Sequence, residues 1–579
     1  MLAMFLFKLL RKTQHILGSG LSANQLIANL AFVNFFLRPR GPDATSHVRM
    51  HGFDFVHNLL HMTGERRPQP FFSHDGRILA LFNGEIYNWR KLSQDAEEQG
   101  LPAFQSDGEA ILPAYQTAGE SFPLALQGEF AIAIFDFESQ KAVFATDVFG
   151  TKPLWYSLSF RKQKLAVASY KSGLLRLGFR SQDIHMVGPN RILTICLQSF
   201  RVLKQTSAFE FDLRQFKTST DDFIHAFNRA VKLRTDDLAP TGRPLFVGLS
   251  SGFDSGAIHA SLHQQAVRHH AFALLAEEMP QMLHDRAIYA KASSEVSVVL
   301  MNDLDFDLER RWLSERAEPF TYLGKNFTGQ RNVLDDFAAI GLSYIVRLSR
   351  DRGALCYLSG TGADEILSDY GFAGKKWCPQ SSFGGLFPEN LSTIFPWAEF
   401  FLSTQRDYLH KEEHVAGAHG VEGRYPFLDP RVVQEYLWLA PEVKNREYKA
   451  PLHDAFQSWG YPFEKRKKTG FAAKANLVSD TSSVLWRYNA HPAPACGLPP
   501  PAPQQLAICE DGPAASQPRC EARCAALGRP LVDTLRCGHL GAWVGRLDCA
   551  RDGGGGGDDG ATLWPEEGPR PPLVIERPL

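Results

Sequence analysis

The segment 244–256, Pro-Leu-Phe-Val-Gly-Leu-Ser-Ser-Gly-Phe-Asp-Ser-Gly, constrains the fold of this 579-residue chain more than any other stretch. It begins with a short apolar run typical of a buried strand and ends in a turn rich in Gly and Ser. Residues 257–266 are then predicted to form a helix. Such a turn presents backbone N–H groups and the positive end of a helix to one anion. The segment therefore predicts an α/β fold with a phosphate site.

The side chains of this turn indicate which kind of phosphate site to expect. The GxxxxGK[ST] pattern is absent, because no Lys follows the glycines, so a Walker-type loop is excluded. The hydroxyls of Ser250, Ser251 and Ser255 can line the site, and Asp254 can hold Mg²⁺ on the phosphates. An ordinary Ser/Gly turn remains the alternative interpretation of the segment taken alone.

Composition narrows the class of protein. A net charge of -1 lacks the basic excess that is typical of nucleic-acid-binding proteins. No apolar run reaches the roughly 18 residues of a membrane span. Only three of the nine cysteines precede residue 490 (Cys196, Cys356 and Cys378), which suits a reducing compartment. The first ten residues are apolar and are followed by basic residues, the reverse of a signal peptide. We therefore expect a cytoplasmic protein of two to four domains.

Residues 1–205 are predicted to form the first domain. Short apolar or alternating runs typical of strands occur at 78–82, 131–135, 142–144 and 165–168, with helical segments at 24–37 and 108–117. Strands dominate and helices cover a face, which predicts an α+β layered sandwich. Residues 207–219 are polar and irregular and are predicted to be a linker.

Four polar clusters punctuate this domain, at 38–43, 83–88, 106–109 and 128–131. Asn-Gly after a strand would by itself predict a hairpin turn. Together, however, the RGPD, NGEIYN, SDxE and GxFA patterns resemble the glutaminase domain of class II amidotransferases, which has an Ntn-hydrolase-like fold. The resemblance implies that Asn83 and Gly84 form an oxyanion hole and that Asp107 holds the glutamine amino group, with Glu85 in the same site.

Two departures from that family predict that this domain does not hydrolyse glutamine. The family uses an N-terminal Cys as nucleophile, whereas Met1 is followed here by Leu2 and no Cys precedes Cys196. The family Arg that pairs with the glutamine carboxylate falls at Leu59, which cannot make a charge-assisted contact. A missed upstream start would restore the Cys but not the Arg.

Residues 220–489 are predicted to form a second domain with a different pattern. Helices at 222–232 and 333–350 alternate with single strands at 270–275, 297–300 and 354–358, in addition to the strand before the Ser/Gly turn. This alternation predicts a parallel sheet with helices on both faces. Ligands of such sheets bind at the carboxyl ends of the strands, where the turn lies.

A second Gly-rich turn, 359–365, follows the last of these strands and ends in Asp364 and Glu365. Because parallel strands end at the same edge of the sheet, Asp364 is predicted to face Asp254 across the phosphates as a second Mg²⁺ contact. The alternative is a plain helix N-terminus, where acidic residues are favoured anyway.

The order of motifs identifies a family resemblance. SSGFDSG, SGTGADE, GVEGRYPFLD (420–429) and the basic segment 463–471 resemble asparagine synthetase, whose ATP-pyrophosphatase domain adenylates aspartate. The resemblance implies ATP and Mg²⁺ as cofactors, release of AMP and pyrophosphate, and glutamine or, for this sequence, free ammonia as nitrogen donor. Arg424 and Asp429 of the third motif could equally form a structural ion pair.

The resemblance also implies roles for single residues. Leu249 and Leu274 would flank the adenosine, Gly360 would pack near the nucleotide, and Lys468 would neutralise the polyphosphate. The residues implied to bind pyrophosphate and Mg²⁺ are Ser250, Ser251, Gly252, Asp254, Ser255 and, for the metal, Asp364.

Thr361 departs from the family at a position that matters for the chemistry. The family motif is SGEGSDE, and its first Glu is thought to assist attack of ammonia on the adenylate. Thr can orient a nucleophile but cannot act as a base at neutral pH, and base assistance is worth roughly 10²–10⁴-fold. The reaction is therefore slower, or a neighbour such as Glu365 substitutes, or the acceptor differs. A β-lactam-synthetase-like enzyme and a degenerate non-catalytic paralogue are the alternatives.

Residues 490–579 form a Pro/Gly-rich, low-complexity tail. We expect it to be disordered or to lie outside the true reading frame. The spacing of Cys520, Cys524, Cys537 and His539 matches no zinc site. The expected partners are small molecules (aspartate, ATP, ammonia or glutamine), without nucleic acid or membrane, and a homodimer is left open.

Overall fold

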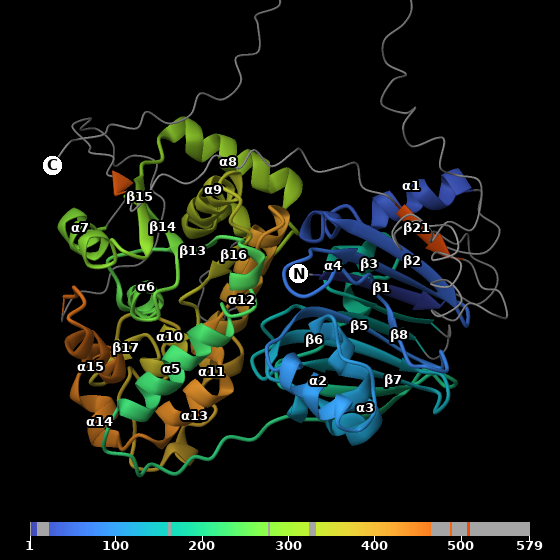
Figure 1. Cartoon of the computed structure of the whole chain (residues 1–579), viewed down its shortest axis with the longest axis horizontal. Coiled ribbons are helices and arrows are strands. Elements are labelled where there is room, and N and C mark those ends of the chain that lie inside the picture. The colour runs from blue at the N-terminus through green and yellow to red at the C-terminus, as the bar shows by residue number, and fades with distance from the viewer. Residues whose placement is uncertain are drawn as a thin grey trace, which may run out of the picture.

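The computed structural model describes residues 2–8, 23–159, 164–275, 278–322, 332–464, 487–488 and 506–509. Figure 1 shows two domains side by side, an N-terminal one built on antiparallel sheets and a C-terminal one built on a parallel sheet. Lys468 lies outside the described residues, as does nearly all of the tail.

Two β-sheets form the N-terminal domain. The first has the order β10-β8-β9-β1-β3-β2-β21 and the second β12-β11-β7-β6-β5-β4. All neighbouring strands are antiparallel except β2 and β21, a short strand from the tail. Their bounds are β1 Leu2–Lys8, β2 Ala44–Met50, β3 Phe53–Leu59, β4 Phe71–Phe72, β5 Ile78–Ile86, β6 Gly128–Asp136, β7 Lys141–Thr146, β8 Trp155–Ser159, β9 Lys164–Ala168, β10 Ile184–Met186, β11 Ile192–Cys196, β12 Val202–Thr206 and β21 Leu506–Cys509.

The two sheets pack face to face between helices. The inner core joins Phe55 of the first sheet to Leu81 and Phe135 of the second. Helices α1 (Ala23–Val33) and α4 (Lys171–Arg176) cover the outer face of the first sheet. Helices α2 (Trp89–Glu97) and α3 (Ile111–Ala118) cover the second. These layers confirm the predicted α+β sandwich.

Asn83 and Gly84 lie within β5 and do not form a hairpin turn. β5 pairs with β6 along its whole length, from Ile78 opposite Asp136 to Ile86 opposite Gly128. Gly84 has φ +140°, and a Cβ there would lie 1.8 Å from the Glu129 carbonyl oxygen. The turn interpretation was wrong because long-range pairing with β6 overrides the local Asn-Gly preference.

The C-terminal domain is built on a sheet with the order β19-β16-β13-β14-β15-β20. Neighbouring strands are parallel except for β20 at the edge. Their bounds are β13 Leu245–Gly248, β14 His269–Leu274, β15 Ser294–Val299, β16 Cys356–Leu358, β19 Glu422–Arg424 and β20 Arg487–Tyr488, and a separate ribbon pairs β17 Gly371–Phe372 with β18 Lys375–Lys376. The predicted parallel sheet is confirmed.

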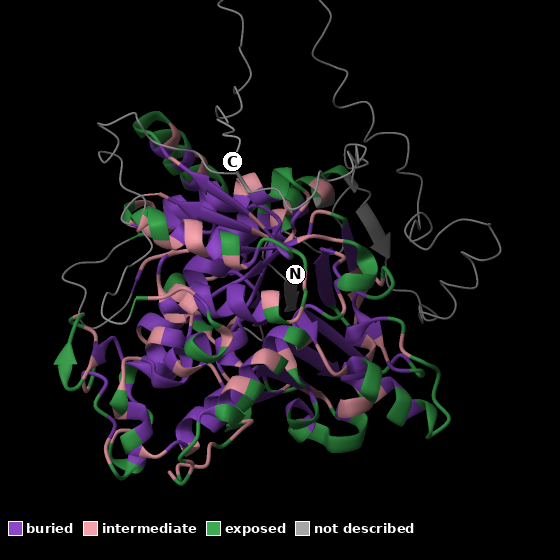
Figure 2. Cartoon of the chain, turned by 60° about the vertical axis from the view of Figure 1, so that its left-hand side comes forward, coloured by how far each residue is buried: buried purple, intermediate pink, exposed green. Residues whose placement is uncertain are grey.

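Helices pack on both faces of this sheet. One face carries α5 Asp221–Leu233, α6 Phe253–Gln264, α7 Pro280–Tyr289, α13 Pro430–Trp438 and α15 Ala450–Trp459. The other carries α8 Asp303–Arg316, α9 Phe337–Asp351 and α12 Thr404–Ala418. Shorter helices are α10 Ala363–Leu367, α11 Ala398–Phe401 and α14 Pro441–Arg446. Figure 2 shows most of the sheet and the inner helix faces as buried.

Helix α6 begins at Phe253, four residues earlier than the predicted start at 257. Asp254 and Ser255 therefore belong to the first helical turn, with Gly252 at the N-cap. Within the described residues, no helix is long and apolar enough to cross a membrane.

Candidate functional site

A cavity of about 710 Å³ lies at the carboxyl ends of β13 and β16. This is the edge where a parallel sheet binds its ligands. The walls come from the two Gly-rich turns, from α9 and α12, and from the start of α15. Predicted site residues that line it are Ser250, Gly252, Asp254, Ser255, Gly360, Thr361, Asp364 and Glu365.

The first turn is ordered by its own hydroxyls. Ser255 Oγ accepts a hydrogen bond from the Ser250 backbone N–H at 2.9 Å and lies 2.8 Å from Ser250 Oγ. The Gly252 N–H donates to Ser250 Oγ at 3.1 Å. These bonds shape the loop directly before α6, so the N-terminus of that helix opens on the cavity.

Arg286, on α7, holds the loop from behind. Its side chain is fully buried, and Nη1 donates to the carbonyl oxygens of Ser250 at 2.5 Å and Gly252 at 2.9 Å. Drawing both carbonyls toward Arg286 leaves the opposite side of the loop for an anion. The sequence carries no signal for Arg286, because it lies thirty residues after Gly256, the end of the Ser/Gly turn, in a helix that carries no recognisable motif.

The two predicted metal carboxylates converge on a lysine that sequence reasoning also missed. Lys449 Nζ contacts Asp254 and lies 2.8 Å from Asp364 Oδ1. Tyr448 donates a hydrogen bond to the same Asp364 oxygen at 2.9 Å. Burial alone would lower the pKa of Lys449, but the charges of both aspartates raise that pKa well above its usual range. Lys449 is therefore a permanent cation between the two turns.

Gly360 brings the two turns into direct contact. A Cβ at this position would lie 2.8 Å from Asp254 Cβ and 3.2 Å from the Asp254 carbonyl carbon. Only a glycine allows the second turn to approach the first this closely.

Three predicted ligand-binding side chains do not reach the cavity. Leu249 and Leu274 are buried in separate apolar clusters, with α7 and α9 respectively. The Ser251 hydroxyl and backbone N–H both donate to Glu278 Oε2, at 2.5 Å each. The apolar pattern and the SSGFDS motif place these residues beside the loop, but apolar packing holds the two Leu side chains in the core and Glu278 holds Ser251.

The second turn presents a hydroxyl and two carboxylates. Thr361 Oγ1 donates to Glu412 Oε1, on α12, at 2.8 Å. Glu365 caps α10 instead: Oε2 accepts from the Gly362 N–H at 3.0 Å and Oε1 accepts from the Tyr370 hydroxyl. Burial raises the pKa of Glu365 to about 7, and neighbouring Asp364 adds to this effect.

The glutaminase-like residues form a much smaller site. Gly84, Glu85, Asp107 and Leu59 line a cavity of about 30 Å³, enough for about two water molecules. Burial raises the pKa of Asp107 to about 7, which weakens it as an anchor for an amino group. Asn83 is buried beside them in β5. Arg67 lines the cavity, but its guanidinium pairs with Glu65 and Glu109.

Glu85 also connects the two domains. It accepts a hydrogen bond from Thr63 at 2.9 Å and forms an ion pair with Arg424 at 3.2 Å. Arg424 pairs in addition with Glu422 at 2.7 Å. The suggested Arg424–Asp429 pair is therefore wrong, because β19 directs the Arg424 side chain toward the N-terminal domain.

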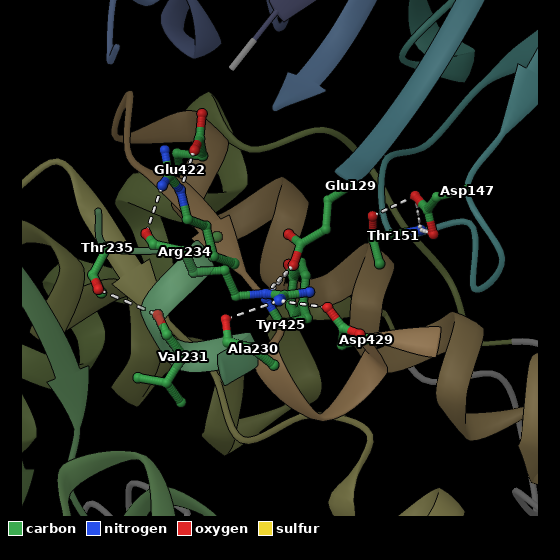
Figure 3. A network of polar contacts seen from close by, with 12 residues as sticks. Glu129, Asp147, Thr151, Ala230, Val231, Arg234, Thr235, Glu422, Tyr425 and Asp429 are labelled. Atoms are coloured by element: carbon green, nitrogen blue, oxygen red, sulfur yellow. Dashed lines mark hydrogen bonds and ion pairs between the residues drawn. The ribbon is translucent and has the colours of Figure 1, made fainter. Parts of the chain in front are cut away.

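Asp429 pairs with Arg234 instead, at 3.2 Å (Figure 3). Arg234 also lies 2.7 Å from Glu129 Oε1 of β6, which accepts the Tyr425 N–H at 2.8 Å. Beside this network, Lys152 lies 2.7 Å from Glu413 of α12. These ion pairs connect the N-terminal domain, beside the smaller site, to the synthetase domain.

In the part of the chain that the structure describes, no group of three or more His, Cys, Asp or Glu residues is arranged to hold a metal ion. Asp254 and Asp364 alone fit Mg²⁺, which commonly takes one or two protein carboxylates together with substrate phosphates. Their shared contact with one cationic nitrogen shows that both oxygens face a single positive centre.

Comparisons with known proteins agree with this architecture. Residues 17–215 match the glutamine amidotransferase domain family, and residues 222–400 and 397–482 match the asparagine synthase family. The chain is 27% identical over 444 residues to asparagine synthetase [glutamine-hydrolyzing] of Rattus norvegicus, covering 70% of this chain and 73% of that protein. It is 27% identical over 458 residues to the Homo sapiens protein of the same name, covering 72% and 76%. With its amidotransferase-like domain in front of a synthetase domain, the chain belongs to the asparagine synthetase family.

Proposed function

We propose that this protein forms asparagine from aspartate, ATP and free ammonia through an aspartyl-adenylate, releasing AMP and pyrophosphate. The observation that carries the proposal is the meeting of Asp254, Asp364 and Lys449 in the 710 Å³ cavity. The family match supports an ATP-dependent ligase that makes asparagine.

In the first step an oxygen of the aspartate β-carboxylate attacks the α-phosphorus of ATP, and pyrophosphate leaves. The loop from Ser250 to Ser255 would hold the pyrophosphate through its N–H groups and hydroxyls, at the N-terminus of α6. Lys449 would neutralise the negative charge that builds up on the leaving group. Asp254 and Asp364 would hold Mg²⁺, which supplies further charge neutralisation when bound.

In the second step ammonia attacks the activated carbonyl carbon, a C–N bond forms and AMP leaves. Thr361 would orient the nucleophile by hydrogen bonding, since it lines the cavity beside Gly360. Lys468 stays a prediction for the polyphosphate side of the site.

Free ammonia, rather than glutamine, is proposed as nitrogen donor because of the small cavity in the first domain. At about 30 Å³ this cavity is far smaller than the roughly 300–1,000 Å³ of typical small-molecule sites. Leu59 lies at the wall of this cavity where the family resemblance places an Arg, and the one guanidinium in the described lining, that of Arg67, pairs with Glu65 and Glu109.

The test measures pyrophosphate and asparagine in the same reaction of Mg·ATP and aspartate, with ammonium or glutamine added separately. Asparagine from ammonium alone is the expected result, and Asp254→Asn should abolish it. Asparagine from glutamine at a comparable rate would overturn the donor assignment. Pyrophosphate without asparagine would favour another amine acceptor, as in the β-lactam-synthetase-like alternative. Neither product in any mixture would favour a non-catalytic paralogue.

A further inference from the structure

We propose that Glu412, on α12, accepts the proton lost by the attacking nitrogen and thereby supplies the carboxylate that position 361 lacks. This assignment rests on the proposed synthetase function. It makes Glu412 a catalytic base brought in from a helix fifty-one residues downstream of the Gly-rich turn.

The first support is the position of Glu412. Its side chain lines the same cavity as Asp254 and Asp364, and Oε1 accepts the 2.8 Å hydrogen bond from Thr361. Thr361 follows Gly360, the residue that touches Asp254. The carboxylate is thus one hydrogen bond away from the side chain that replaces the family glutamate.

The second support is Oε2 of Glu412, a buried oxygen that accepts no hydrogen bond from the described residues. Glu412 is only 8% exposed, and its Oε2 has no hydrogen-bond partner among the described residues. A buried carboxylate oxygen without a partner is costly, so such groups commonly serve a ligand or a reaction. Burial also raises the pKa of Glu412, although the hydroxyls of Ser359 and Thr361 and the charge of Lys411 oppose this effect.

The other nearby carboxylates are already engaged. Both oxygens of Glu365 accept hydrogen bonds that cap α10 and anchor Tyr370. Glu413 pairs with Arg40 and Lys152 at the domain interface. Asp364 contacts Lys449, which stabilises its charged form. Glu412 therefore has the oxygen best placed to accept a proton.

The step balances without any further reactant. As the nitrogen lone pair forms the bond to the acyl carbon, the nitrogen becomes positively charged. One N–H proton passes to Glu412 Oε2, and the C–O bond to AMP breaks with its electron pair on the phosphate. The protonated Glu412 returns its proton to water after product release.

The experiment separates adenylation from amide formation. Aspartate-dependent ATP–pyrophosphate exchange without a nitrogen donor reports the first step, and asparagine made from ammonium reports both. Glu412→Gln keeps the size of the side chain and an oxygen that accepts from Thr361. We expect near-normal exchange and a loss of roughly 10²–10⁴-fold in asparagine formation. Glu442→Gln, an exposed change of the same chemistry on α14, should leave both rates unchanged.

Each contrary outcome has a distinct meaning. Equal asparagine formation by wild type and Glu412→Gln, with exchange present in both, would overturn the Glu412 assignment alone. An equal loss of exchange and synthesis would also overturn it, since that pattern indicates a structural role. Absence of exchange in the wild type would overturn the proposed function and the assignment with it.

Two further readouts distinguish a base from a packing residue. Hydroxylamine is a stronger nucleophile and is uncharged near neutral pH, so Glu412→Gln should lose much less hydroxamate formation than asparagine formation. The double variant Thr361→Glu/Glu412→Gln returns the carboxylate to position 361 and should recover synthesis relative to Glu412→Gln. Equal losses with both nucleophiles, and no recovery in the double variant, would contradict proton transfer to Glu412.

Discussion

Lys449 Nζ lies 2.8 Å from Asp364 Oδ1 and also contacts Asp254, so one buried ammonium joins the two Gly-rich turns of the synthetase domain. The turns follow different strands, β13 and β16, which are neighbours in the sheet. Lys449 comes from a third segment, at the start of α15, where its backbone is left-handed with φ 50°. The site is therefore assembled from three distant parts of the chain.

The Lys449→Met variant should lose adenylation. Without the ammonium, the described residues place no cation between the two carboxylates to stabilise the leaving pyrophosphate. Removing one such electrostatic contact typically costs roughly 10²–10³-fold in rate. The measurement is aspartate-dependent ATP–pyrophosphate exchange, with the exposed Lys291→Met as control. Exchange at the wild-type rate in Lys449→Met would remove this lysine from the mechanism.

The Gly360→Ala variant should be both less stable and less active. The new Cβ would lie 2.8 Å from Asp254 Cβ, so the turns must separate. Overpacking of this kind costs about 1–3 kcal/mol of unfolding free energy. Gly188→Ala is the matched control, because its Cβ would meet nothing closer than 3.7 Å. Chemical denaturation measures the difference, and equal stability of the two variants would contradict the close approach.

The buried ion pair between the domains should contribute strongly to stability. Arg234 and Glu129 lie 2.7 Å apart with side chains 2% and 3% exposed. Arg234→Met removes the nearer of two cations beside buried Glu129 and leaves Lys152 at 3.9 Å, so the expected cost is up to about 3–5 kcal/mol. The Arg180–Asp183 pair has similar geometry, 2.8 Å, but both side chains are exposed. Arg180→Met should therefore change stability by less than about 1 kcal/mol.

A double-mutant cycle tests the cause of that loss. Adding Glu129→Gln to Arg234→Met removes the buried charge that has lost its nearer partner, so the double variant should recover part of the stability. Strict additivity of the two single changes would show that the pair does not interact.

Glu318 should make stability depend on pH. It accepts hydrogen bonds from the Ser172 N–H, at 2.8 Å, and from the Ser172 hydroxyl, which ties the domains together. Burial raises the pKa of Glu318 from 4.5 to about 7, so the folded state holds the proton more tightly than the unfolded state. This contribution is present below pH 4.5 and is lost as pH rises toward 7, by up to about 3 kcal/mol.

The Glu318→Gln variant tests whether Glu318 makes the unfolding free energy fall as pH rises. It cannot titrate, so its unfolding free energy relative to wild type should rise between pH 4.5 and 7. Glu315→Gln, an exposed change one turn earlier in the same region, should run parallel to wild type. A difference between Glu318→Gln and wild type that stays constant with pH would contradict the raised pKa.

Much of the architecture follows from patterns that are local in the sequence. Alternating apolar runs predict the sandwich, and single apolar strands between helices predict the parallel sheet, because each pattern buries the face that its secondary structure presents. The two Gly-rich turns are also local, since a strand end, glycines and a helix start are contiguous in the chain. Asp254 and Asp364 were placed together because adjacent parallel strands end at one edge.

The remaining contacts depend on tertiary structure, because they join residues with no local motif. Lys449, Arg286 and Glu412 reach the site from helices whose sequences resemble ordinary surface or core helices. The side-chain directions of Ser251 and Leu274, and the pairing of Gly84 within β5, likewise depend on neighbouring elements. The sequence by itself determined the two fold patterns, the family and the position of the two Gly-rich turns at neighbouring strand ends. Only the folded chain decided which lysine and which further carboxylate lie beside these turns, because long-range packing brings Lys449 and Glu412 there.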